Sequence, residues 1–124
     1  MKARTTLLQS IFGAFLILGG IAHFLKPELY DLMIPDPLPK TAVNYLTGLV
    51  ELVLGVGVFI PRYRCVATLG IFLLMIAFLP IHVIDAFRDE PAIGSKALAY
   101  VRLPLQFVLI GWAWFLHKKD RQSL

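Results

Sequence analysis

Four apolar runs divide the chain, and polar or proline-containing segments separate them. The runs cover residues 6–25, 41–60, 65–84 and 97–116. A helix needs about 20 apolar residues to cross a hydrocarbon core that is roughly 30 Å thick. The pattern therefore predicts an all-α membrane protein, a bundle of four transmembrane helices that forms a single domain over residues 1–124.

The segment between the first two runs has a different pattern. Residues 27–40 read PELYDLMIPDPLPK, so that Leu29 and Leu32 stand beside Glu28 and Asp31, with prolines after them. Mixed apolar and acidic positions predict a short amphipathic turn or helix that lies at the membrane interface. The alternative is a stiff connector that only spaces the two helices.

The composition excludes several classes of protein. Hydrophobic residues make up 58% of the chain and charged residues 16%, an excess that so small a globule could not bury, so the surplus must face lipid. The net charge of +4 comes from short segments that flank the apolar runs. The sequence has neither a basic helix nor a basic patch interleaved with aromatic residues, which argues against nucleic-acid binding. The one cysteine cannot form an intramolecular disulfide or a CxxC site.

The basic residues are unevenly distributed between the two sides that the four spans define. One side would carry Lys2, Arg4, Arg62, Arg64, Lys118, Lys119 and Arg121. The other side would carry Lys26, Lys40, Arg88 and Lys96, together with most of the acids. Because cytoplasmic loops are enriched in Lys and Arg, we expect both termini to be cytoplasmic. The expected location is the bacterial inner (plasma) membrane.

Several ionisable residues lie inside the apolar runs, where a charge costs several kcal/mol unless it faces the bundle interior. The second run has polar and small residues at spacings of three and four, which share one helix face: Asn44, Gly48, Glu51 and Gly55. In the fourth run, Arg102 and Gln106 are four residues apart. Arg102 cannot be deprotonated and needs an anion or water. We therefore predict that Glu51 and Arg102 interact, directly or through Gln106 or water.

The predicted orientation places most of these residues in the outer half of the membrane. They would line a polar pocket that opens outward beneath residues 27–40, above a dry, apolar inner half. The candidate ligand-binding or structural cluster comprises His23, Asn44, Glu51, His82, Asp85, Arg102 and Gln106. A purely structural interpretation stays open, with Glu51 and Arg102 as a lock between helices. No HxxxH or HxxE spacing fixes a metal site, and no residue is identified as catalytic.

Three segments resemble the DoxX family of small four-helix membrane proteins. They are GIAHFLKPELY (residues 20–30), TGLVELVLGVGVFIPRYR (residues 47–64) and VRLPLQFVLIGWAW (residues 101–114). The family pattern falls on His23, Pro27, Glu51, Arg102, Pro104 and Gln106. The third run departs from it, with LPIHV where the family has an asparagine-containing stretch. Relatives in that family resemble small subunits of thiosulfate:quinone oxidoreductase, partners of membrane oxidoreductases in stress responses and, more distantly, an animal chaperone for receptor assembly.

Three functions follow from the residues and this resemblance. The first is a redox-linked accessory membrane subunit or assembly factor, which is favoured because the chain has no cofactor motif, no dithiol and little extramembrane mass. The second is a protein that binds quinone or another small molecule, which would be an enzyme only as an oxidoreductase component. The third is a small transporter or proton carrier. The expected partners are membrane lipid and a protein partner or a second copy of the chain.

Overall fold

The computed structural model describes residues 2–122, without the side chains of residues 2–5. The side chains of Lys2 and Arg4, which were counted among the basic residues of one side, therefore lie outside the description. The helices are α1 (Lys2–Leu25), α2 (Glu28–Asp31), α3 (Lys40–Phe59), α4 (Arg64–Ala86) and α5 (Lys96–Gln122). Four of these helices are long and apolar enough to cross a membrane, which confirms the predicted fold class. The fourth span continues beyond residue 116 because the Lys and Arg residues that follow are good helix formers.

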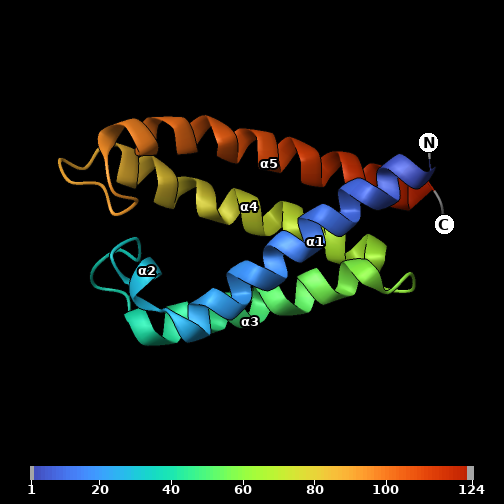
Figure 1. Cartoon of the computed structure of the whole chain (residues 1–124), viewed down its shortest axis with the longest axis horizontal. Helices are drawn as coiled ribbons and strands as arrows, with labels where there is room; N and C mark the ends of the chain where they lie inside the picture. The colour runs from blue at the N-terminus through green and yellow to red at the C-terminus, as the bar shows by residue number, and fades with distance from the viewer. Residues whose placement is uncertain (1, 123–124) are drawn as a thin grey trace.

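The long helices pack as two pairs, α1 with α3 and α4 with α5 (Figure 1). The chain termini lie at one end of the molecule together with the turn between α3 and α4, and we call this the terminal end. Helix α2 and the loop of residues 87–95 lie at the opposite end, which we call the outer end. Helix α1 crosses obliquely from α3 at the outer end toward α5 at the terminal end.

Glycines bring α1 and α3 into close contact. A Cβ atom on Gly48 would lie 2.7 Å from the Cβ of His23, and one on Gly55 would lie 2.9 Å from the carbonyl oxygen of Gly13. Real side-chain atoms do not approach so closely, so only glycine fits at both positions. The predicted face of small residues on the second span is thus an interhelical contact, as expected for transmembrane helices that pack through small residues.

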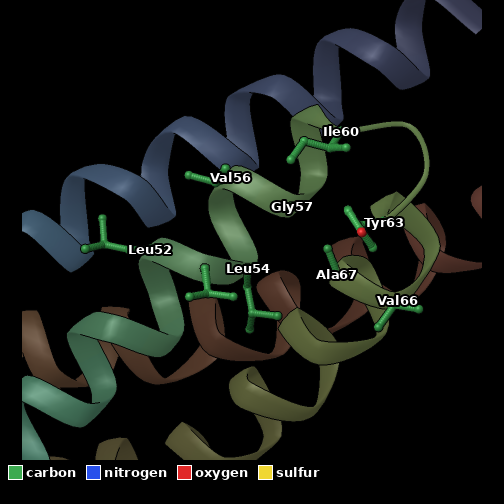
Figure 2. Close-up of a pocket in the computed structure, with 9 residues that line it drawn as sticks. Leu52, Leu54, Val56, Gly57, Ile60, Tyr63, Val66 and Ala67 are labelled. Carbon is green, nitrogen blue, oxygen red and sulfur yellow. The ribbon is translucent and has the colours of Figure 1, made fainter.

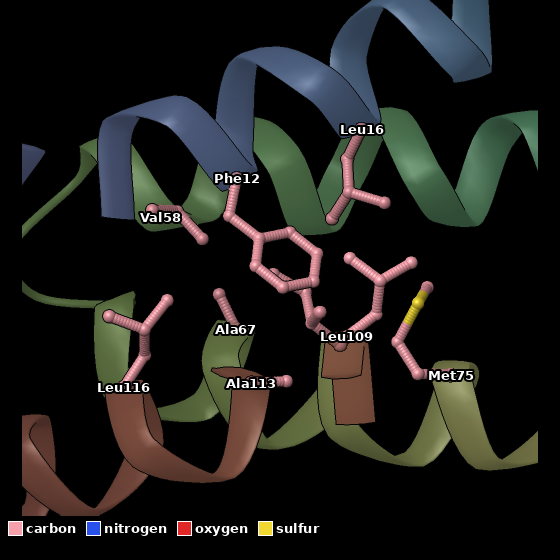
Figure 3. Close-up of a cluster of buried hydrophobic side chains, with 9 residues drawn as sticks. Phe12, Leu16, Val58, Ala67, Met75, Leu109, Ala113 and Leu116 are labelled. Carbon is pink, nitrogen blue, oxygen red and sulfur yellow. The ribbon is translucent and has the colours of Figure 1, made fainter. Parts of the chain in front are cut away.

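An apolar core joins the two pairs near the middle of the bundle and at the terminal end (Figure 3). Its buried side chains come from all four long helices: Phe12, Leu16, Val58, Ala67, Ile71, Met75, Leu109, Ala113 and Leu116. Many other large apolar side chains face outward on every long helix. Such a surface is stable only in a hydrocarbon environment, so the four apolar helices indicate an integral membrane protein.

Candidate functional site

A buried polar network lies between α1 and α3 at the outer end. His23 Nδ1 lies 2.5 Å from Asn44 Oδ1, and His23 Nε2 lies 3.2 Å from Glu51 Oε2. The side chains of His23, Asn44 and Glu51 are all buried. The His23 imidazole also stacks on the ring of Tyr30, with 3.7 Å between ring centroids and an interplanar angle of 15°. One imidazole thus contacts residues of α2 and α3 at the same time.

Asn44 fixes the position of the segment that carries α2. Its Nδ2 donates to the carbonyl oxygen of Pro27 at 2.9 Å and to Asp31 Oδ1 at 3.0 Å. Lys40 Nζ adds hydrogen bonds to the carbonyl oxygens of Asp31 and Ile34. The amphipathic segment therefore contains a short helix, and its backbone is held against the start of α3.

Tyr30 covers the imidazole of His23 from the side of α2. Burial raises the pKa of the Tyr30 hydroxyl above its ordinary value of 10.0, and the negative charge of Glu51 raises it further. The phenol is therefore neutral at physiological pH, and its contact with His23 is an aromatic stack without a charge on Tyr30.

Asp85 organises the second loop of the outer end. Its carboxylate accepts backbone N–H groups of Ala92 at 2.6 Å and Ile93 at 3.3 Å, and it lies 3.5 Å from Arg88 Nη1. Arg88 Nη1 also donates to the carbonyl oxygen of Leu32 at 2.5 Å, which links this loop to the α2 segment. We call residues 27–34 and 87–95 together the outer cap.

The remaining predicted residues belong to the pair α4 and α5. Gln106 is completely buried, and its Nε2 donates to the carbonyl oxygen of Met75 at 2.7 Å. Among the described residues, Gln106 Oε1 and Arg102 Nη1 are buried and have no hydrogen-bond partner. His82 lies within electrostatic range of both Arg102 and Asp85. His82, Asp85 and Arg102 therefore form a second set on α4 and α5, separate from the network of His23, and Gln106 binds α4 at Met75.

The predicted direct interaction between Glu51 and Arg102 is not formed among the described residues. Glu51 faces His23 of α1, and no ion pair within residues 2–122 includes Arg102. The physical reason is the pairing of the helices, because α3 and α5 do not pack against each other. The lock between helices that involves Glu51 joins α3 to α1.

Sequence reasoning missed a polar network at the terminal end. The side-chain amide of Gln9 donates to Asp120 Oδ1, and the Thr68 hydroxyl lies 3.1 Å from Asp120 Oδ2. His117 Nδ1 lies 3.1 Å from the carbonyl oxygen of Cys65. The prediction of a dry inner half is therefore wrong at this end. The spacing of His117 and Asp120 on one face of a longer fourth helix was the signal that could have revealed it.

The two cavities that we describe are lined mainly by apolar side chains. The first, of about 510 Å³, lies between α3 and α4 near their turn, and Figure 2 shows Leu52, Val56 and Ile60 at its wall. The second, of about 200 Å³, lies between α1 and α5 and has Arg102 and Trp112 among its lining residues. Of the seven predicted site residues, only Arg102 lines one of these two cavities, the second.

Two residues that line the second cavity, Arg102 and Trp112, each have a buried hydrogen-bond donor without a partner among the described residues. The two donor atoms are Arg102 Nη1 and Trp112 Nε1. The other lining residues are apolar side chains of α1 and α5: Ile11, Phe12, Phe15, Leu105 and Leu109. Beneath the α2 segment, by contrast, the polar side chains bind one another. In the described part of the chain, no three His, Cys, Asp or Glu side chains are placed to hold a metal ion.

The chain matches a known family. The family described as "Domain of unknown function (DUF8561)" matches residues 12–117. This range includes the outer cap and both polar sets at the outer end, and it leaves out Gln9 and Asp120. Neither the curated proteins nor the solved structures gave a match.

Proposed function

We propose that this chain, which belongs to the DUF8561 family of unknown function, is a small membrane accessory subunit or assembly factor that presents its outer cap to a protein partner. The observation that carries this proposal is the use of its buried polar groups. His23, Asn44 and Asp85 each hold a helix or a segment of the cap through hydrogen bonds. Their arrangement suits a rigid binding surface better than a reaction centre.

The surface of the cap has the composition of a binding site. Leu29, Leu32 and Phe87 are exposed there, together with the acidic Glu28 and Asp89. Protein interfaces commonly have an apolar centre with a polar rim. The resemblance to the DoxX family stays a prediction, and it supports an oxidoreductase as the partner and a redox-linked role.

Site-specific photo-crosslinking in native membranes tests this proposal. A photoreactive residue would replace Leu32, which is 68% exposed on the cap, or Val66, which is 71% exposed on α4 at the terminal end. We expect a single protein adduct from position 32 and lipid adducts from position 66. Arg88→Leu should weaken the adduct, because it removes the link between the two halves of the cap. Lipid adducts alone from position 32 would refute the proposal.

The proposed topology places both termini in the cytoplasm of a bacterium, with the cap outside the inner membrane. The charges at the terminal end support it, because Arg62, Lys118 and Lys119 would then follow the positive-inside rule. In a Cys65→Ser background, Asp89→Cys should react with an impermeant thiol reagent in intact cells, and Arg62→Cys should react only after lysis. The reverse pattern would invert the topology.

A second candidate function is the binding of a quinone or another amphiphile with an oxygen acceptor. The cavity between α1 and α5 favours it, because its lining residues Arg102 and Trp112 have donors that are buried without partners among the described residues. Buried donors of this kind usually have a partner, which a bound ligand would supply. Mass spectrometry of lipid extracts should find a stoichiometric ligand in the wild type that Arg102→Leu loses and the lipid-facing variant Val101→Leu keeps. Bulk phospholipid alone in all three samples would exclude this function.

A further inference from the structure

The hydrogen bonds of Asn44 determine which nitrogen of His23 carries a proton. Asn44 Nδ2 lies 2.9 Å from the carbonyl oxygen of Pro27, which can only accept a hydrogen bond. The amide nitrogen must therefore point toward Pro27, and the amide oxygen toward His23. Because that oxygen also only accepts, His23 Nδ1 at 2.5 Å is the donor and carries a proton.

This assignment constrains the contact on the other side of the imidazole. His23 Nε2 lies 3.2 Å from Glu51 Oε2. If neither atom carried a proton, a nitrogen lone pair would face a carboxylate oxygen without a donor between them. Glu51 Oε2 is buried and has no hydrogen-bond partner among the described residues. One proton at the 3.2 Å contact would satisfy both atoms, either as an imidazolium with a carboxylate or as an imidazole with a carboxylic acid. The pair has no net charge in either form, which lowers the cost of its burial in a membrane.

The groups around the pair offer no alternative counter-charge to Glu51. From α2, the neutral Tyr30 stacks on the imidazole and Asp31 binds Asn44. From α3, Lys40 is engaged with backbone oxygens of the α2 segment and with Asp36. From α1, besides His23, the uncharged Gly19 lies beside the carboxylate. Within the described residues, His23 is the one ion-pair partner of Glu51.

We propose that His23 and Glu51 form a proton-binding site whose single exchangeable proton keeps the α2 segment closed. Release of this proton to water at the outer surface leaves a carboxylate facing the lone pair of Nε2, so that the imidazole must turn away. Turning breaks its stack on Tyr30 of α2 and its bond with Asn44, the residue that binds Pro27 and Asp31 of the α2 segment. Because the closed state binds one more proton than the open state, a rise in pH favours opening.

This inference does not depend on whether the cap binds a partner, since hydrogen exchange of the cap alone can test it. Exchange of the amides of residues 27–34 would be followed in the full chain in lipid nanodiscs, after correction for the intrinsic pH dependence. We expect protection to fall by about tenfold for each pH unit between two midpoints. These are the titration midpoint of the pair in the open cap and its higher midpoint in the closed cap. Constant protection from acid to alkaline pH would overturn the proposal.

Three variants identify the titrating group. Glu51→Gln supplies an amide N–H to Nε2 without a titratable proton, so its protection should be independent of pH. Tyr30→Phe keeps the stack and removes the phenol, and Glu28→Gln removes an exposed acid of α2, so both should retain the pH-dependent step. The same step in Glu51→Gln would overturn the proposal.

A spectroscopic measurement on the wild type keeps the test independent of how the variants fold. Nitrogen-15 NMR of His23 should show a proton on Nδ1 throughout the range in which the cap is closed. It should also show that Nε2 changes at the pH at which protection falls. A neutral imidazole with its proton on Nε2 and a bare Nδ1 in the closed state would contradict the assignment.

Discussion

The close contact of α1 with α3 makes Gly55 a sensitive position. A Cβ atom there would lie 2.8 Å from Ile17 Cγ1, 2.9 Å from the carbonyl oxygen of Gly13 and 3.2 Å from the backbone nitrogen of Ile17. Two of these three atoms belong to the backbone of α1, so a change of side-chain rotamer cannot relieve the overlap. In Gly55→Ala the two helices must move apart or slide, and the packing around them must adjust.

The expected size of the effect follows from two opposing contributions. Inserting a methyl group into a well-packed contact costs about 1–3 kcal/mol. Alanine in place of glycine recovers up to about 1 kcal/mol through helix propensity. Gly111 of α5 provides a matched control, because a Cβ atom there would meet nothing within 4 Å. Gly111→Ala therefore gains the propensity without the overlap, and the two variants should differ by about 1–3 kcal/mol.

Unfolding of both variants would be followed by circular dichroism in one detergent, with the wild type beside them. We expect Gly55→Ala to unfold first and Gly111→Ala to be at least as stable as the wild type. Equal stability of the two alanine variants would refute the close packing of α1 on α3.

Three further variants test the remaining contacts. Gln106→Leu should lower the free energy of unfolding by about 1–2 kcal/mol, because the hydrogen bond to the carbonyl oxygen of Met75 is lost. An unfolding curve like that of the wild type would contradict this role of Gln106. Asp120→Asn should lower the free energy of unfolding by a similar amount, since the carboxylate accepts two hydrogen bonds. An unchanged free energy of unfolding would show that Asp120 does not stabilise the terminal end. Arg88→Leu should cost less than about 1 kcal/mol but speed hydrogen exchange in residues 27–34, and unchanged exchange would disprove the link within the cap.

The four spans and the face of α3 were predictable because both depend on local periodicity. Apolar runs of membrane-spanning length give the number of helices. Spacings of three and four put Asn44, Gly48, Glu51 and Gly55 on one face of α3, and the structure buries all four residues there. The segment between α1 and α3 was also recognisable as an amphipathic turn or helix, because acids and leucines alternate in it.

The partners of these residues were not predictable in the same way. Periodicity gives the face of a helix on which Glu51 lies, but it does not say which helix that face contacts. Charge complementarity suggested Arg102, whereas the glycine contact between α1 and α3 places His23 next to Glu51. Hydropathy also placed the end of the fourth span too early, so that Asp120 was not considered as a half-buried acceptor.

The polar residues of the outer end form two separate sets, and Glu51 contacts His23 and not Arg102. Double-mutant cycles on the free energy of unfolding test this arrangement most directly, with leucine at each of the three positions. We expect a coupling of about 1 kcal/mol or more between His23 and Glu51, and none between Glu51 and Arg102. A coupling of that size between Glu51 and Arg102, with none between His23 and Glu51, would contradict it.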